Sequence, residues 1–421
     1  MKIAFLVNDL QLSGGVGVVV EHARRLSTRE GWDVTLVLVR APEGPHWHGY
    51  EQLPHLHVRE REEALAERYD VAVATWWETA FTLFELRAER YAYFVQSFED
   101  RFYRSDQAER FGAGLTLDLP VSFITEARWI ASTLAQLRPE APCLLVRNGI
   151  DKATFAPPPE LPPPSDEPLR ILIEGSPSSW FKGVHEAVIT AAAMSEARHV
   201  TVVTGERGAL GDVPADEVVG PLTHREISDR YARSDVVLKL SRVEGMFGPP
   251  LEGFHRGATC VVTPVTGHEE YVEHGWNGLI TEWDDPRGTA RQLDLLARDR
   301  ELLHFLRHNA LETARAWPSW EQSSEFMAAA LLAIRREPPP PAGAGAARLL
   351  ADLRGGLEGY TGHLKERADF ARRALRFERR LVRVRESRPV RLLARLRRYR
   401  LARALARPVR PITRRVRRLF S

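Results

Sequence analysis

The sequence is poor in cysteine and contains no long apolar run. Only two cysteines occur among its 421 residues. Cys143 and Cys260 lie far apart, each beside an apolar stretch, so buried reduced thiols are expected rather than a disulfide or a metal site. No segment approaches the roughly 18 consecutive apolar residues of a membrane-spanning helix. The N-terminal run IAFLV is too short for the core of a signal peptide, and a cytoplasmic protein is expected.

Two successive series of strand and helix patterns predict an α/β protein with two doubly wound domains. The first series opens with KIAFLV, a glycine turn that begins the helix SGGVGVVVEHARRL, and DVTLVLV; further strands are expected over 70–75, 91–96 and 121–125. The second series has strands expected over 169–175, 199–205, 235–241, 259–264 and 278–281. Ligands of such folds bind at the carboxyl ends of the strands, so a site is expected in a cleft between the domains.

Two proline-rich stretches divide the chain, because proline is excluded from helix interiors and central strands. We predict a Rossmann-like domain over 1–155, a linker over 156–168, a second Rossmann-like domain over 169–336, a linker over 337–347, and a helical, arginine-rich extension over 348–421. In the extension, apolar residues recur in steps of three and four, a short coiled-coil-like pattern, at Leu350, Leu353, Leu357, Tyr360 and Leu364.

The stretch SRVEGMFGPPLEGF, residues 241–254, places Glu244 and Glu252 on either side of a glycine-proline turn. We expect a strand, a loop with Glu244, and a helix that begins near Pro250 with Glu252 in its first turn. The N–H groups of GMFG and the positive end of the helix favour an anion, whereas a carboxylate accepts hydrogen bonds from sugar hydroxyls. A ligand with both kinds of group, a nucleotide-sugar, is therefore predicted. Alternatively, Glu252 only stabilises the helix N-terminus, which leaves Glu244 without an explanation.

The same stretch resembles the signature of two glutamates separated by seven residues in retaining glycosyltransferases of family 4, which have the GT-B fold. Three other segments agree with that family in order and spacing: VRNGID before the first linker, Lys182–Gly183, and PSWEQ near Trp320, which is similar to the start of the last cross-over helix. The resemblance covers roughly residues 1–335. It implies an acceptor-side N-terminal domain, a nucleotide-sugar-binding C-terminal domain, and transfer of a hexosyl or deoxyhexosyl group in cell-surface polysaccharide synthesis.

The resemblance also implies a role for each matching residue. Glu244 would hold donor-sugar hydroxyls, Glu252 the ribose, and Lys182 would neutralise the diphosphate as the glycosidic bond breaks. The backbone of Met246, Phe247 and Gly248 would surround the sugar and diphosphate. The remaining members of the implied donor site are Gly14, Gly15, Ser176, Gly183 and Leu222. The nucleotide-diphosphate sugar is a co-substrate, and no separate cofactor or metal is expected.

Two positions depart from the family pattern. Ser176 stands where the family usually has an arginine, so one phosphate-neutralising charge is missing unless hydrogen bonds from the SPSS loop replace it. Gln96 stands where many members have a histidine near the transferred sugar; glutamine hydrogen-bonds a hydroxyl but relays no proton. Together with Glu244 and Lys182, Gln96 completes the expected catalytic set, and a strand-end residue that only caps backbone is the alternative. The segment around Gln96 is similar to a subgroup of surface-polysaccharide enzymes that includes rhamnosyltransferases.

The net charge of +3 conceals an asymmetry: residues 380–421 hold 16 arginines and one acid, so they carry +15 and the preceding residues carry −12. Such a tail predicts an anionic partner. An anionic membrane surface suits an enzyme with a glycan or lipid-linked acceptor, and a protein peripheral to the inner face of the cell membrane is expected. Nucleic acid is not an expected partner, because the tail has few aromatic residues for stacking bases. A solvated or partner-binding extension is the third alternative.

Two other functions are compatible with the same residues. A nucleotide-sugar epimerase or hydrolase with this fold needs additional acidic or histidine groups across the cleft, which the sequence does not assign. A non-catalytic, membrane-associated sugar-nucleotide-binding protein is favoured by the missing arginine and histidine. The intact Glu244, Glu252 and Lys182 argue against it.

Overall fold

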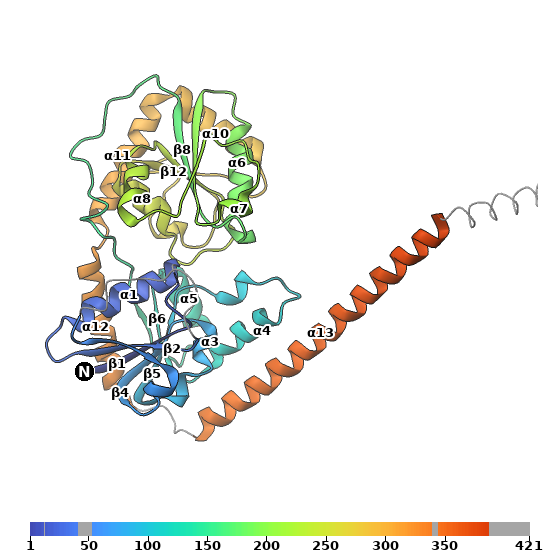
Figure 1. Cartoon of the computed structure of the whole chain (residues 1–421). Helices are drawn as coiled ribbons and strands as arrows, with labels where there is room; N and C mark the ends of the chain where they lie inside the picture. Colours follow the sequence, from blue (N-terminus) through green and yellow to red (C-terminus); the bar gives the residue numbers. More distant parts are fainter. Residues whose placement is uncertain (12, 41–52, 339–343, 387–421) are drawn as a thin grey trace, which may run out of the picture. The chain divides into compact units, whose positions relative to one another are not determined.

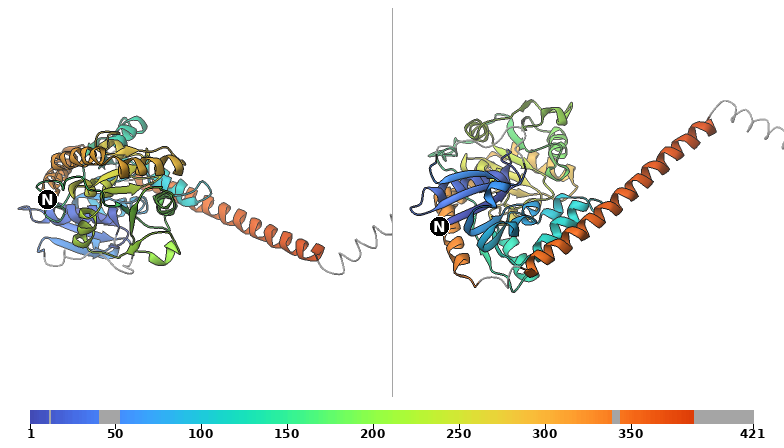
Figure 2. Two further views of the ribbon diagram at one scale, coloured as in Figure 1. Left: turned by 90° about the horizontal axis from the view of Figure 1, so that it is seen from above. Right: turned by 60° about the horizontal axis from the view of Figure 1, so that its bottom comes forward.

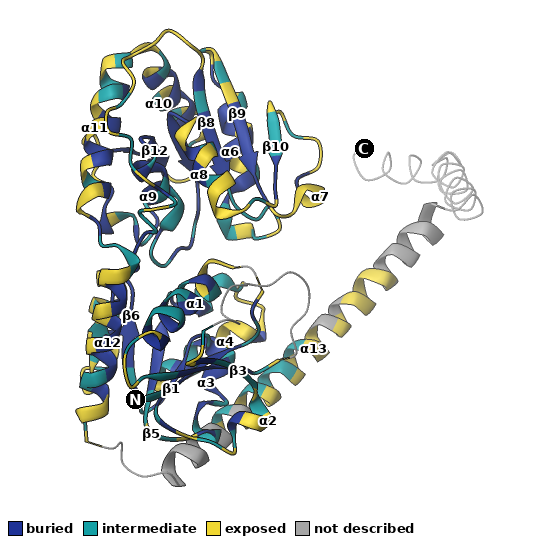
Figure 3. Ribbon diagram, turned by 60° about the vertical axis from the view of Figure 1, so that its left-hand side comes forward, coloured by how far each residue is buried: buried dark blue, intermediate teal, exposed yellow. Residues whose placement is uncertain are grey.

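The structure, a computed structural model, describes residues 1–11, 13–40, 53–338 and 344–386. The chain divides into two compact units, Met1–Gly355 and Gly356–Ser421. The first unit contains two parallel sheets, each with helices packed on both faces (Figure 1, Figure 2). Both sheets are buried along most of their strands (Figure 3). This accounts for the near-continuous apolar runs in the sequence, since parallel strands are covered on both sides.

The N-terminal sheet has seven strands in the order β3-β2-β1-β4-β5-β6-β7. The strands are β1 (Lys2–Val7), β2 (Asp33–Leu38), β3 (Leu56–Glu60), β4 (Arg68–Ala74), β5 (Arg87–Val95), β6 (Ser122–Thr125) and β7 (Cys143–Leu145). Its α-helices are α1 (Gly14–Ser27), α2 (Arg61–Ala64), α3 (Trp77–Ala80), α4 (Ala108–Leu115) and α5 (Arg128–Leu137), with short 3₁₀ helices η1 (Leu83–Glu85), η2 (Glu99–Phe102) and η3 (Thr116–Asp118). Strand β3 was not predicted, because it is half-polar and lies at the sheet edge.

The C-terminal sheet has six strands in the order β10-β9-β8-β11-β12-β13. They are β8 (Leu169–Glu174), β9 (Arg198–Val203), β10 (Glu217–Val219), β11 (Val236–Lys239), β12 (Thr259–Val262) and β13 (Leu279–Ile280). The helices are α6 (Val184–Ala192), α7 (Arg207–Leu210), α8 (His224–Ala232), α9 (Gly248–His255), α10 (Pro286–Arg298) and α11 (Arg300–Ala316), with η4 (Trp180–Lys182) and η5 (His268–Glu270). Strand order reverses at β8, between β9 and β11, where ligands of such sheets bind.

Helix α12 (Trp320–Arg336) packs against the N-terminal domain, although it follows the second sheet in sequence. Met327, Leu331 and Ile334 on this helix are buried in the same core as α1 and β1. The sequence-based division kept this segment within 169–336 as a cross-over helix that starts near Trp320, where α12 begins. The helix crosses back because its apolar stripe fits the N-terminal core rather than that of the domain before it.

The two chain crossings between the domains are bonded to each other. Ile150 pairs with Ser319 in an isolated bridge, and the Trp317 indole N–H donates to the carbonyl of Asn148 over 2.9 Å. A Cβ on Gly149 would lie 2.4 Å from the Cα of Trp320, so only glycine allows this approach. The NGI segment of the VRNGID motif therefore acts at the junction of the domains.

The second unit contains most of one long helix, α13 (Ala344–Glu386), of 43 residues. Leu353, Leu357, Tyr360 and Leu364 follow one side of it, at the spacing predicted for a coiled-coil-like pattern. In the part of the chain that the structure describes, no helix combines the length and hydropathy needed to cross a membrane. The arginine-rich end of the predicted extension, residues 387–421, lies outside the described residues.

Candidate functional site

The centre of the candidate site is an ion pair between Lys182 and Glu244. The Lys182 ammonium donates to Glu244 Oε2 over 2.8 Å. Lys182 ends η4, and the next residue, Gly183, has φ +62° and packs so tightly on β11 that a Cβ would lie 2.1 Å from the carbonyl oxygen of Leu240. This glycine brings the loop after β8 against the loop after β11, so the two side chains meet at the carboxyl edge of the sheet.

A second lysine, Lys239, completes the charge cluster. Its side chain is only 3% exposed, and its Nζ lies 3.8 Å from Glu244 Oε1 and 3.7 Å from Glu174 Oε2. It also donates to the Glu174 carbonyl over 3.2 Å. Sequence reasoning missed this residue. The signal is the charged position inside the apolar run DVVLKLS, since a central parallel strand buries both faces and a lysine there requires a partner.

The two ammonium groups keep Glu244 ionised despite its burial. Burial alone would raise the pKa of Glu244, but Lys182 and Lys239 outweigh that effect and hold the pKa below its ordinary value. Burial alone would also lower the pKa of Lys182, but the Glu244 carboxylate leaves it above its ordinary value. The arrangement is a carboxylate that accepts hydrogen bonds, next to two cations that attract an anion.

Glu252 lies on α9 in a different electrostatic state. Burial and the nearby Glu174 carboxylate raise the pKa of Glu252 to about 8. Helix α9 begins at Gly248 and not near Pro250, which places Glu252 beyond the first turn. The alternative in which Glu252 stabilises the helix N-terminus is therefore wrong. At pH 7 this pKa favours the protonated form of Glu252, because the opposing effects of Tyr231 and Lys239 are smaller than the effect of burial.

The start of α9 offers fewer amide donors than the sequence suggested. Pro249 and Pro250 have no N–H, and the Met246 N–H donates to the Glu126 carboxylate over 2.8 Å. The Phe247 side chain is buried, and its carbonyl accepts a hydrogen bond from the Tyr271 hydroxyl. The N–H groups of Phe247 and Gly248 remain at the helix start, where no intrahelical acceptor exists for them. A Cβ on Gly248 would meet nothing within 4 Å, so the space beside it is open.

Gly15 and Gln96 of the N-terminal domain contact each other, and Gln96 also contacts the loop that carries Glu244. Gln96 donates through its side-chain amide to the carbonyl of Gly15 over 3.2 Å. A Cβ on Gly245 would lie 1.8 Å from the backbone carbonyl of Gln96, and the indole N–H of Trp129 donates to the Gly245 carbonyl over 3.0 Å. The end of β5 therefore touches the loop that carries Glu244. The Gln96 side chain caps backbone, as the alternative interpretation held, and the Gln96 backbone contacts the loop that carries Glu244.

Glu126, which sequence reasoning also missed, joins the domains from the end of β6. Its carboxylate accepts hydrogen bonds from the Met246 N–H and, over 2.7 Å, from the side-chain amide of Asn148. Burial raises the pKa of Glu126 to about 7, although both hydrogen bonds oppose that shift. Asn148, the asparagine of VRNGID, thus donates to the Glu126 carboxylate, and the same carboxylate binds the Met246 N–H of the loop that carries Glu244. The only signal in the sequence was a glutamate directly after a strand.

The other predicted site residues have mixed placements. Ser176 does not replace the missing arginine with a free donor, since Ser176 and Ser178 both donate to the Glu206 carboxylate. Leu222 follows the cis Gly220–Pro221 bond and packs against the apolar core beneath α8 and α9. Gly14 opens α1, with nothing within 4 Å of a Cβ built on it, so the first turn of the N-terminal domain is accessible.

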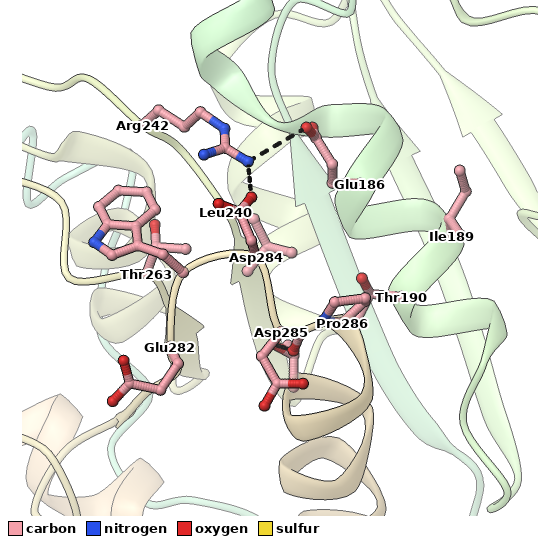
Figure 4. Close-up of a pocket in the computed structure, with 12 residues that line it drawn as sticks. Glu186, Ile189, Thr190, Leu240, Arg242, Thr263, Glu282, Asp284, Asp285 and Pro286 are labelled. Atoms are coloured by element: carbon pink, nitrogen blue, oxygen red, sulfur yellow. Dashed lines mark hydrogen bonds and ion pairs between the residues drawn. The ribbon is translucent and has the colours of Figure 1, made fainter.

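A cavity of about 260 Å³ lies elsewhere on the C-terminal domain, between α6 and the start of α10 (Figure 4). Arg242 spans it, pairing with Glu186 over 3.9 Å and with Asp284. None of the predicted donor-site residues lines this cavity. We assign it no part in the chemistry.

Comparison with known proteins agrees with this geometry. Residues 170–299 match the family model described as Glycosyl transferases group 1. Over 87 residues, 21% of the chain, the sequence is 33% identical to N-acetyl-alpha-D-glucosaminyl L-malate synthase of Bacillus anthracis, and the match spans 23% of that protein. The chain thus matches about a quarter of the length of this curated relative.

Solved structures extend the likeness to both domains. HepE of Anabaena, in complex with UDP and glucose, is 17% identical, with a TM-score of 0.63 over 79% of this chain and 100% of that chain. Sucrose-phosphate synthase of Thermosynechococcus elongatus is 16% identical, with a TM-score of 0.63 over 79% of this chain and 99% of that chain. WaaG, a glycosyltransferase involved in lipopolysaccharide biosynthesis, is 12% identical, with a TM-score of 0.59 over 80% of this chain and 100% of that chain.

The protein has the GT-B fold, and its C-terminal domain is similar to the group 1 glycosyltransferases. In this GT-B protein the family match covers the domain that carries Lys182, Lys239, Glu244 and Glu252. The structural likenesses, all below 20% identity, establish the fold of both domains. The predicted fold class, two Rossmann-like domains in a GT-B arrangement, is confirmed.

Proposed function

We propose that the protein is a retaining glycosyltransferase that moves a sugar from a nucleoside diphosphate sugar to a glycan or lipid-linked acceptor in cell-surface polysaccharide synthesis. The observation that carries the proposal is the Lys182–Glu244 pair with Lys239 behind it, at the carboxyl edge of the second sheet. A pair of cations next to an ionised carboxylate matches a ligand with an anionic diphosphate and neutral hydroxyls.

The donor is assigned from the chemistry of the site and from the structural neighbours. HepE binds UDP and UDP-glucose, which supports a nucleotide-sugar as the ligand of this fold. In the proposed complex, the diphosphate lies between Lys182 and the N–H groups of Phe247 and Gly248 at the start of α9. Glu252 accepts from the ribose hydroxyls, and Glu244 from hydroxyls of the transferred sugar.

Lys239 takes the electrostatic role of the arginine that the sequence lacks. The ammonium group of Lys239 comes from β11 and not from the loop after β8, and it lies 3.8 Å from Glu244 Oε1. Its contribution is to keep Glu244 ionised and to add a second positive charge near the leaving diphosphate, whose negative charge grows as the bond breaks. Gln96 supplies a neutral hydrogen-bonding group where a histidine is common in the family.

The proposed reaction needs no nucleophile from the protein. The acceptor hydroxyl oxygen attacks the anomeric carbon on the face from which the diphosphate departs. The bond between that carbon and the diphosphate oxygen breaks, and the diphosphate takes the hydroxyl proton. The products are the glycoside and a nucleoside diphosphate. The rate comes from orientation of the two substrates and from stabilisation of the diphosphate, and metal independence is part of the proposal.

Isothermal titration of the full chain with UDP, dTDP, GDP and ADP tests the donor assignment. We expect one of them to bind with at least tenfold preference over the others. Lys182→Gln should weaken that binding at least tenfold, because the ammonium that meets the diphosphate is gone. Arg87→Gln, an exposed arginine at the start of β5, serves as the control and should bind as the wild type does. Failure of every nucleoside diphosphate to bind would overturn the proposal.

A further inference from the structure

A cavity of about 630 Å³ lies next to the candidate donor site and shares none of its residues. The N-terminal domain lines it with residues of the segment 101–110, and the C-terminal domain with Trp180 and Val243. Val243 directly precedes Glu244, and Trp180 lies two residues before Lys182. The cavity therefore opens beside the charged pair, and its volume is in the range of small-molecule sites.

The wall of this cavity is bonded to the loop that carries Glu244. Arg101 donates to the Thr266 hydroxyl over 2.9 Å, and that hydroxyl donates to the Glu244 carbonyl over 3.3 Å. The Trp180 indole N–H donates to the Phe102 carbonyl over 3.0 Å, and the rings of Phe102 and Phe181 stack with centroids 4.9 Å apart. A ligand in the cavity is thus held by both domains, at a fixed place relative to Glu244.

The lining of the cavity carries more positive than negative charge. Arg101, Arg104 and Arg110 line it, with Asp106 as the single carboxylate of the lining. Within the described residues, no ion pair involves Arg104 or Arg110, although arginines such as Arg128, Arg170 and Arg307 pair with carboxylates. A guanidinium matches the planar or tetrahedral geometry of a carboxylate or phosphate. Asp100 interacts electrostatically with Arg101 and Arg110 and offsets part of their charge. The positive charge that remains on the lining, which includes Arg104, indicates an anionic ligand.

Aromatic side chains supply the second half of the site. The Tyr103 hydroxyl accepts a hydrogen bond from the Trp77 indole over 3.0 Å, which fixes the ring against the cavity. Trp180 remains 42% exposed. Aromatic rings combine a large apolar face with a polar edge, and they pack well against the C–H face of a sugar ring. Arginine and aromatic groups together therefore match a sugar that carries an oxyanion.

We propose that this cavity binds the acceptor, and that the acceptor carries an oxyanion, a phosphate or a carboxylate, on or next to the sugar that receives the new bond. The inference rests on the proposed glycosyl transfer and adds the chemical class of the second substrate. Arg104 and Arg110 hold the oxyanion, and Trp180 and Tyr103 flank the ring. The acceptor hydroxyl then points toward the loop of Glu244, where the donor sugar lies.

The test is a ligand-observed NMR titration of the full chain with three small sugars. Glucose 1-phosphate carries a phosphate, methyl glucuronide a carboxylate, and methyl glucoside neither. We expect one or both anionic sugars to bind at least tenfold more tightly than methyl glucoside, and the better one identifies the anion. Arg104→Gln combined with Arg110→Gln should remove this preference. Arg87→Gln lies in the same domain, at the first residue of strand β5, and should keep the preference for the anionic sugar.

Two outcomes overturn the inference. One is an anionic preference that survives the double substitution while nucleoside diphosphate binding is intact, and the other is methyl glucoside binding as tightly as the anionic sugars. Glucose 1-phosphate binding that Lys182→Gln abolishes and the double substitution leaves unchanged belongs to the donor site, and also counts against it. Failure of the proposed function is separate, since it appears as loss of nucleoside diphosphate binding in the wild type.

Discussion

Lys182 and Glu244 form a hydrogen-bonded ion pair over 2.8 Å, although they come from loops after two different strands. The same ammonium is the group best placed to meet a diphosphate. In the proposed complex, Lys182 exchanges its carboxylate partner for a phosphate partner, and Glu244 becomes free to accept hydrogen bonds from sugar hydroxyls. The structure thus has Lys182 and Glu244 already paired with each other at the proposed donor site.

Glu244→Gln should separate donor binding from transfer. The substitution removes the competitor for Lys182, so the affinity for the preferred nucleoside diphosphate should stay the same or rise. Transfer should fall about 100-fold or more, which corresponds to roughly 3 kcal/mol of lost transition-state stabilisation. The two quantities come from calorimetry and from initial rates with the matching sugar nucleotide. A parallel loss of binding and transfer would show that the pair is only structural.

Lys239→Met should move the pH dependence of transfer. Lys239 helps to hold the pKa of Glu244 below its ordinary value, so its removal raises that pKa. Glu244 must be ionised to act, and activity lost as the pH falls should therefore be lost at a higher pH in the variant. We also expect about tenfold weaker diphosphate binding, or roughly 1.4 kcal/mol. Lys239→Arg keeps the positive charge, so its activity should be lost at the same low pH as in the wild type. If Lys239→Met also loses activity at the wild-type pH, Lys239 does not tune the pKa of Glu244.

Gly245→Ala tests the contact between the domains. The new Cβ would lie 1.8 Å from the carbonyl oxygen of Gln96, so the domains must move apart at this point. Transfer should fall at least tenfold, while nucleoside diphosphate binding changes little because Lys182 and α9 belong to one domain. Gly114→Ala on α4 is the matched control. Its Cβ meets nothing within 4 Å, and the helix should gain roughly 0.5–1 kcal/mol. Equal rates for Gly245→Ala and the wild type would contradict the contact.

Glu252→Gln should stabilise the protein at high pH. The folded-state pKa of Glu252 is about 8, above its ordinary value of 4.5. A group whose pKa is raised on folding contributes stability that is complete below the unfolded pKa and is lost as the pH rises through the folded pKa. Glutamine does not ionise, so the variant should gain stability relative to the wild type between pH 5 and pH 9. A gain of about 1 kcal/mol corresponds to roughly 2–4 °C in the thermal midpoint.

The control for this measurement is Glu160→Gln, an exposed carboxylate in the linker between the two sheets. Thermal melts of the three proteins at pH 5.5 and pH 9 give the comparison. A midpoint difference for Glu252→Gln that is the same at both pH values would show that Glu252 is ionised throughout. That result would mean that the positive charge of Lys239 offsets the burial of Glu252 in full.

Removal of the basic tail tests the predicted membrane partner. A chain that ends at Glu386 retains α13 and lacks most of the arginines of the tail. It should no longer sediment with vesicles that contain anionic lipid, whereas the full chain should do so at low salt and less at high salt. Neither protein should sediment with neutral phosphatidylcholine vesicles. Equal sedimentation of the two proteins with anionic vesicles would exclude the tail as the membrane contact.

The sequence was most informative where chemistry and backbone geometry coincide. The two sheets follow from buried apolar runs, and Glu244, Lys182 and Gly183 follow from a motif whose glycine permits the close approach of two loops. Lys239 and Glu126 were not predicted, because their importance comes from contacts with residues far away in sequence. The availability of amides at α9 was also overstated, since no pattern shows that Glu126 occupies the Met246 N–H.

A crystal structure of the protein with its preferred nucleoside diphosphate sugar tests the central claim most directly. The account predicts that diphosphate oxygens lie within hydrogen-bond distance of Lys182 Nζ and of the Gly248 N–H, and that the bond between Lys182 and Glu244 is broken. A donor bound in the cavity beside Arg242, or a complex in which Lys182 and Glu244 remain paired, would contradict it.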